Sequence, residues 1–88
     1  MGQVLHSIQN NPEHTVEIVV HINESLEEQG RRDLVFALEN DEGITSAEFC
    51  PLHYHLMLVR YNRDLYSSQD VLGCVKAQRL DARLIGPV

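Results

Sequence analysis

Hydrophobic and polar residues alternate most clearly over residues 15–22, and this alternation predicts a first β-strand. Val16, Ile18, Val20 and Ile22 stand at every second position, and the segment is rich in β-branched residues, which strands favour. Side chains two residues apart share one face of a strand, so these four residues are predicted to face a core.

The following segment changes from a two-residue to a helical period. Apolar residues recur at spacings of three and four over residues 26–38, which is typical of a helix with one buried face. Ser25 and Glu28 have the S-x-x-E form of a capping box, which predicts that the helix begins there. Gly43 predicts the end of the segment.

Two more strands are predicted over residues 44–49 and 53–61. Pro51 cannot donate a backbone hydrogen bond, so it interrupts the extended pattern and predicts the turn of a hairpin. The stretch from Leu56 to Val59 is apolar at every position, whereas a strand buried on one face alternates with polar residues. The second of these strands is therefore predicted to have apolar side chains on both faces.

A second helix and a last strand complete the pattern. Either Ser67 or Ser68 is placed to cap a helix that carries Val71 and Val75, and residues 82–85 form a short apolar run before Gly86-Pro87. The predicted order is βαββαβ. This order predicts an α+β fold of the ferredoxin-like kind, a sandwich with two helices on one face of a four-stranded antiparallel sheet.

Length and charge restrict the class of protein further. The chain has 88 residues, which suffices for one core, and we predict a single domain over residues 14–88 after an N-terminal tail or short helix over residues 1–13. A formal charge of −6 argues against nucleic-acid binding, which requires a basic surface. The sequence contains no apolar run long enough to span a bilayer, so we expect a cytoplasmic protein without membrane contact.

The two cysteines, Cys50 and Cys74, are too few for a disulfide framework, and we expect reduced thiols. Cys74 falls within the apolar pattern of the second predicted helix and is interpreted as a small buried residue. Cys50 stands at the predicted hairpin, close in sequence to other potential metal ligands.

The chain resembles the heavy-metal-associated (HMA) domain of copper chaperones over about residues 15–86. The resemblance rests on core positions and spacings: Leu34, Ala37-Leu38, Gly43-Ile44, Val59-Arg60-Tyr61-Asn62, Ser67 or Ser68, Val71 and Val75. It implies a ferredoxin-like fold with strand order 4-1-3-2. Alignment on these residues places Glu27 and Gly30 where the family has the two cysteines of its Cys-x-x-Cys motif. A carboxylate and a glycine cannot replace two thiolates as ligands of Cu(I).

A different set of ligands lies at the predicted hairpin. Cys50, His53, His55 and Met57 fall within eight residues, and alternation along a strand would place the last three on one face. In the fold that the resemblance implies, His21 would lie at the same end of the sheet and could approach His53 or His55. Thiol, imidazole and thioether groups suit Cu(I), or Zn(II) if Met57 takes no part.

A second candidate site is apolar. Val19, Tyr54, Leu56 and Leu58 are predicted to lie together on the sheet face that the helices leave open. Exposed apolar patches commonly mark association surfaces. We expect a homodimer or a protein partner there.

Two functions follow from these sites. The leading one is a non-enzymatic, metallochaperone-like domain that binds Cu(I) or Zn(II) at the hairpin. The alternative is an interaction or oligomerisation adaptor without a metal site. A ligand-binding regulatory module of the ACT-like kind is a third possibility, although the segment between the first strand and helix lacks the usual glycine. Catalysis is not expected, because the sequence offers no clear nucleophile–base pair.

Overall fold

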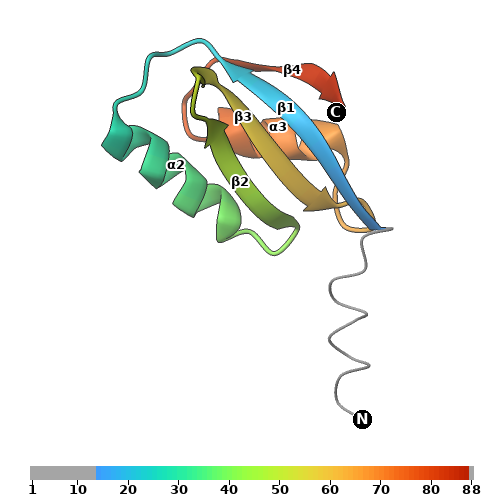
Figure 1. The fold of residues 1–88 in the computed structure, drawn as a ribbon. Coiled ribbons are helices and arrows are strands. Elements are labelled where there is room, and N and C mark those ends of the chain that lie inside the picture. The colour runs from blue at the N-terminus through green and yellow to red at the C-terminus, as the bar shows by residue number, and fades with distance from the viewer. Residues whose placement is uncertain (1–13, 88) are drawn as a thin grey trace.

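A computed structural model of the chain describes residues 14–87, so the predicted N-terminal tail over residues 1–13 lies outside the described residues. The elements follow the predicted order βαββαβ (Figure 1). They are β1 (Thr15–Ile22), α2 (Glu28–Glu39), β2 (Ile44–Cys50), β3 (His53–Asn62), α3 (Ser68–Lys76) and β4 (Ala82–Pro87).

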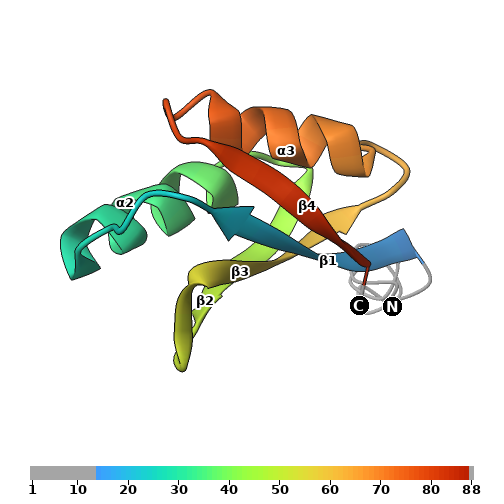
Figure 2. The same ribbon diagram turned by 90° about the horizontal axis from the view of Figure 1, so that it is seen from above.

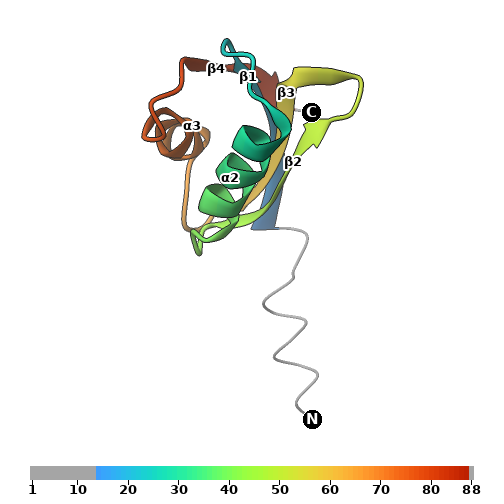
Figure 3. The same cartoon turned by 90° about the vertical axis from the view of Figure 1, so that its left-hand side faces the viewer.

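The four strands form one antiparallel sheet in the order β2-β3-β1-β4, which is the predicted order. Both helices lie on the same face of this sheet (Figures 2 and 3). Helix α2 packs beside β2, and α3 packs beside β4. The fold is therefore the ferredoxin-like sandwich that the pattern predicts, with β2 and β4 at the two edges of the sheet.

The core lies between the sheet and the two helices. Ile18, Val20 and Ile22 of β1 are buried, as their alternation predicts. The remaining buried apolar residues come from every other element: Leu34, Leu38, Ile44, Ala47, Met57, Val59, Tyr61, Val71, Val75 and Ala82. Burial of this apolar surface is the main term that stabilises the fold.

The two helices begin differently from one another. Ser67 is the N-cap of α3, and its side chain and that of Asp70 form a reciprocal capping box, which confirms one of the two serines predicted there. The predicted capping box at Ser25 is wrong. Helix α2 begins at Glu28 with Glu27 as its N-cap, and no side chain caps it.

The loop before α2 is held by other contacts, which explains why Ser25 does not cap the helix. Asn23 donates its backbone N–H to the carbonyl of Asp81 at 2.9 Å and its side-chain amide to the Asp81 carboxylate at 2.6 Å. The backbone N–H of Asp81 in turn donates to both carboxylate oxygens of Glu24, at 3.0 and 3.1 Å. This clasp, formed by Asn23, Glu24 and Asp81, joins the β1–α2 loop to the α3–β4 loop.

A second cross-link joins the α2–β2 loop to the β3–α3 loop and to α3. The Tyr66 hydroxyl donates a hydrogen bond to the Asp41 carboxylate, and the thiol of Cys74 lies 3.6 Å from the second carboxylate oxygen. The bond to Tyr66, aided by the Gly43 N–H, lowers the pKa of Asp41, and the same bond raises the pKa of Tyr66 to about 12. Cys74 is partly buried against the core, and burial raises the pKa of its thiol.

No helix within residues 14–87 is long and apolar enough to cross a membrane.

Candidate functional site

The tip of the β2–β3 hairpin departs from regular strand pairing. Phe49 lies opposite Met57, but the next residue, Cys50, lies opposite His53. Residues 54–56 of β3 therefore have no partner in β2, and this irregularity interrupts the regular alternation of side chains between the two faces. The tip of the hairpin curls away from the helices (Figures 2 and 3).

Because of this irregularity, side chains at the hairpin tip lie on other faces of the sheet than the sequence pattern predicts. Tyr54 lies on the helix side, where the Arg31 guanidinium of α2 stands 4.0 Å from the centre of its ring. His55 stacks on His21, with ring centroids 5.8 Å apart and an interplanar angle of 16°. Because His21 alternates with the buried residues of β1, this stacking places His55 on the open face of the sheet.

Two members of the predicted metal cluster, His21 and His55, lie in contact with each other. The Nδ1 atom of His55 lies 2.7 Å from the carbonyl oxygen of Ile22. A carbonyl only accepts, so Nδ1 carries the hydrogen, and in the neutral ring Nε2 keeps its lone pair. The Nδ1 atom of His21 is buried and has no hydrogen-bond partner among the described residues. The structure thus brings His21 and His55 together, and metal binding by this pair stays a prediction.

The other predicted ligands are dispersed. Cys50 is half-buried at the end of β2, and His53 is exposed opposite it. Met57 is fully buried in the core between sheet and helices, away from the open face that carries the two stacked histidines. In residues 14–87 no three His, Cys, Asp or Glu side chains are grouped closely enough to hold a metal ion.

The positions that correspond to the family's cysteines lie at the start of α2. Glu27 is the exposed N-cap, and its carbonyl accepts a hydrogen bond from the Arg31 N–H at 2.9 Å. Gly30 lies in the first turn, and a Cβ atom there would be 3.6 Å from Cβ of Leu26. The loop that leads to these positions is fixed by the clasp to Asp81. Neither residue supplies a thiolate, so this end of α2 lacks the soft ligands that Cu(I) favours.

The predicted apolar patch on the open face is only partly exposed. Val19 and Leu58 are cross-strand partners, and both are half-buried, as is Leu56 opposite His21. Tyr54 is 53% exposed but lies against Arg31 on the helix side. Association through this face stays a prediction.

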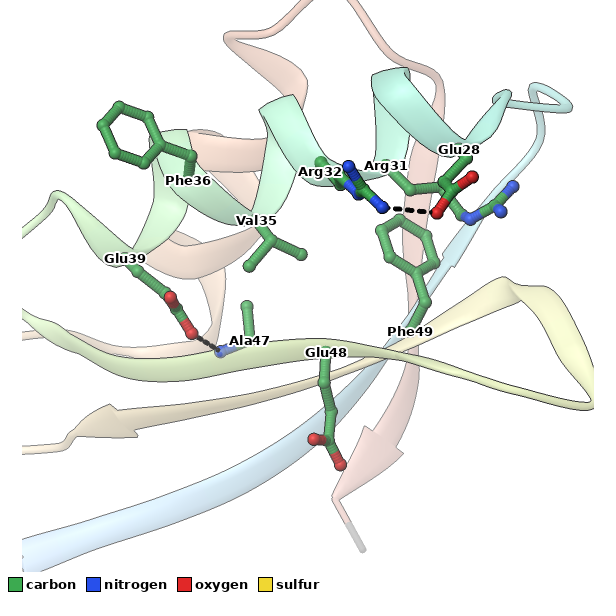
Figure 4. A pocket seen from close by; sticks show the side chains of 9 residues that line it. All are labelled: Glu28, Arg31, Arg32, Val35, Phe36, Glu39, Ala47, Glu48 and Phe49. Atoms are coloured by element: carbon green, nitrogen blue, oxygen red, sulfur yellow. Dashed lines mark hydrogen bonds and ion pairs between the residues drawn. The ribbon is translucent and has the colours of Figure 1, made fainter.

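A further apolar surface, which the sequence pattern did not predict, lies beside the edge strand β2. A hollow of about 510 Å³ lies between α2 and the edge strand β2 (Figure 4). Val35 points from the helix toward Ala47 on the strand, and the ring of Phe49 closes one end of the apolar floor. Phe36 at the rim is 72% exposed. We refer to this surface as the α2–β2 hollow.

Phe36 is the residue that could have indicated the α2–β2 hollow. It follows Val35 directly and falls outside the buried stripe that Leu34 and Leu38 define. A phenylalanine at an exposed helical position leaves a large apolar ring in water. Its position within α2 was therefore the available signal.

The free edge of β2 forms one side of the α2–β2 hollow. Among the described strands, β2 has β3 on one side and no neighbour on the other. The Glu39 carboxylate at the end of α2 accepts the Ala47 N–H at 3.0 Å (Figure 4). That N–H therefore points away from β3, and Glu39 occupies one of the backbone donors that a further strand would use.

Charged residues surround the apolar floor. Arg32 pairs with Glu28 one turn earlier on α2, with 2.6 Å between guanidinium and carboxylate, and both side chains are 69% exposed. Exposed ion pairs of this kind contribute little to stability, so Arg32 can exchange its partner at small cost. The first half of α2 thus contributes Arg31, Arg32 and Glu28 to the rim, and its last residue, Glu39, contributes a further acidic group.

Comparisons with known proteins identify the fold. No family model matches the sequence, and no curated protein matches it. Among solved structures, the copper-binding domain of the P-type ATPase HMA7 matches with a TM-score of 0.73 and 17% identity, over 82% of this chain and 96% of that one. The yeast copper transporter domain Ccc2a matches with a TM-score of 0.71 and 11% identity, over 83% and 99%.

A bacterial structure gives the same result. The N-terminal domain of a potential copper-translocating P-type ATPase from Bacillus subtilis matches with a TM-score of 0.69 and 20% identity, over 84% of this chain and 91% of that one. This chain therefore has the HMA-like fold, as the resemblance implies. At these identities the likeness establishes the architecture alone, and function has to be argued from the residues.

Proposed function

We propose that this domain is a non-enzymatic protein-binding module, and that its binding surface is the α2–β2 hollow. The observation that carries the proposal is Phe36, an aromatic side chain 72% exposed at the rim of an apolar hollow. Aromatic residues beside apolar pockets are the usual anchors of protein interfaces. The adjoining edge of β2 offers backbone groups to an extended segment, so the surface supplies both apolar contact and main-chain hydrogen bonds.

A peptide selection tests this function directly. Displayed peptides that alternate apolar and charged residues are selected on the wild-type domain and then measured against two variants. We expect binding to be lost in Phe36→Asp and kept in Leu58→Glu, which places the same kind of change on the open face. Circular dichroism is used to check that both variants fold. Peptides that bind Phe36→Asp as tightly as wild type, or that fail only with Leu58→Glu, contradict the proposal.

A transition-metal site is the second candidate function, and the stacked His21–His55 pair favours it. Metal-binding histidines commonly donate their second ring N–H to a carbonyl, which fixes the ring and leaves the other nitrogen free. His55 has this arrangement with Ile22. In this proposal Zn(II) or Cu(I) binds to Nε2 of His55, His21 assists, and Cys50 and His53 approach from the hairpin tip.

Titration of the apo protein with Zn(II) and Cu(I), in competition with a chromophoric chelator, tests the metal proposal. Stoichiometric binding that is lost in His21→Ala with His55→Ala supports it. A second double variant, Cys50→Ala with His53→Ala, measures the contribution of the hairpin tip. Absence of stoichiometric binding, or binding unaffected by both double variants, refutes the proposal.

A further inference from the structure

We propose that the occupant of the α2–β2 hollow is a second copy of this chain, docked about a two-fold axis that passes between Val35 and Phe36. This inference rests on the proposed function, because it assigns a partner to the same surface. Three features of that surface favour a second copy: the free edge of β2, the order of side chains on α2, and the contacts of Glu39 and Arg32, which can be exchanged for new ones.

The edge of β2 is suited to pairing with an identical strand. A two-fold axis brings two copies of one strand together in antiparallel order. Val35 faces Ala47 across the hollow, so an axis at the level of Val35 also passes near Ala47 (Figure 4). The Ala47 N–H points outward, and alternation along an antiparallel strand directs the backbone groups of Phe49 the same way. Two β2 strands would thus join the two sheets into one.

The exposed face of α2 is complementary to itself. Arg32, Val35, Phe36 and Glu39 follow one another at spacings of three, one and three residues, so they share one side of the helix. In two antiparallel helices, residues at equal distances from the axis face each other. Arg32 of one copy therefore faces Glu39 of the second copy, and the two Phe36 rings meet near the axis. This Arg32–Glu39 ion pair forms twice in the dimer, because the interface is isologous.

Glu39 links the free and the paired states. In the single chain its carboxylate covers the Ala47 N–H, a common way to protect an edge strand from unwanted pairing. In the dimer, Glu39 turns to Arg32 of the second copy, and Ala47 becomes available to the second β2. Arg32 gives up its ion pair with Glu28, which is exposed to solvent and contributes little to stability. Arg32, Glu39 and the Ala47 N–H thus each gain a new partner in the dimer, which favours a second copy over an unrelated strand.

Net charge makes this arrangement specific. The chain carries a formal charge of −6, so two copies repel each other unless opposite charges meet at the contact. The Arg32–Glu39 pairing supplies that local attraction. Like-charged residues placed opposite each other at this contact would therefore oppose association strongly.

A charge-exchange experiment tests the two-fold arrangement. Wild type, Arg32→Glu and Glu39→Arg are each measured by sedimentation velocity over a wide concentration range, and the two variants are then mixed in equal amounts. We expect wild type to dimerise and each variant alone to associate at least about tenfold more weakly, because like charges then face each other. In the mixture every contact joins opposite charges, so a 1:1 heterodimer should form, identifiable by native mass spectrometry.

A matched control separates local pairing from overall charge. Both variants remain net negative, since each substitution changes the charge of −6 by two. Arg63→Glu and Glu42→Arg make the same changes at exposed loop positions and should leave dimerisation of each variant alone as in wild type. A mixture of Arg32→Glu and Glu39→Arg that stays monomeric while wild type dimerises overturns the proposed axis.

The peptide selection distinguishes failure of this inference from failure of the proposed function. A wild-type chain that stays monomeric at every concentration overturns the second copy as the occupant. If selected peptides nevertheless bind through Phe36, the α2–β2 hollow is a binding site for another protein. If neither the second copy nor any peptide binds there, both proposals are wrong.

Discussion

Met57 provides a direct test of the distinction between core and site. Sequence spacing groups it with His53 and His55, whereas the structure buries it completely between sheet and helices. A thioether in that position packs against apolar neighbours and cannot reach a metal at the open face. We therefore predict that replacing Met57 changes stability and leaves any metal binding unchanged.

The expected magnitude follows from complete burial. Truncation of a fully buried methionine to alanine removes about 2–5 kcal/mol, because transfer free energy is lost and a cavity remains. A chain of 88 residues is stabilised by roughly 0.05–0.15 kcal/mol per residue, so Met57→Ala removes a large share of the total. For a domain of this size the melting temperature should fall by at least about 8 °C. Met57→Leu nearly conserves volume and should cost less than about 1.5 kcal/mol.

Thermal and urea unfolding, followed by far-UV circular dichroism, measure both effects. Leu52→Ala is the matched control, since Leu52 at the hairpin tip is 86% exposed and should change stability by less than about 0.5 kcal/mol. Metal titration of the folded Met57→Leu variant completes the test. The reasoning fails if Met57→Ala is as stable as wild type, or if Met57→Leu stays folded and loses a metal that wild type binds.

Three further predictions concern stability. Ser67→Ala removes the capping box of α3 and should cost about 1 kcal/mol in urea unfolding, with Ser67→Asp restoring most of it. Because the pKa of Asp41 is lowered on folding, its contribution to stability is fully present above the ordinary aspartate pKa of 3.8 and is lost as the pH falls further. The stability difference between wild type and Asp41→Asn should therefore shrink between pH 5 and pH 2.5, and a constant difference would contradict this. Gly43→Ala places a Cβ atom 2.8 Å from the Tyr66 ring and should lower the melting temperature, whereas Gly73→Ala, with nothing within 4 Å of its Cβ, should not.

Local sequence signals predicted the fold well where local contacts decide the structure. The alternation over residues 15–22 gave β1 its bounds and its buried face, because every second residue of β1 packs under the helices. Ser67 was one of the two serines expected to cap α3, and its partner in the structure, Asp70, lies only three residues away. Ser25 has an equally good local pattern, yet contacts from Asp81, far along the chain, fix the preceding loop and override it.

The candidate sites were less predictable, because they depend on register and on tertiary arrangement. Alternation alone places His55 beside Met57, but the unpaired stretch at the hairpin tip moves His55 to the face of His21. The α2–β2 hollow is lined by Phe36 of α2 and Phe49 of β2, and no short sequence spacing relates these two residues. The sequence therefore indicated candidate ligands at the hairpin but could not assign their faces.

The clasp between Asn23, Glu24 and Asp81 has a consequence for the order of folding. It joins residues 58 and 57 positions apart, and closing so long a segment costs chain entropy that only later contacts repay. We expect the β1–α2 loop to become ordered after β4 has joined the sheet, although the loop itself lies early in the sequence. A fluorescent label at Ser25 would then report the completion of the whole domain rather than the formation of the adjacent helix.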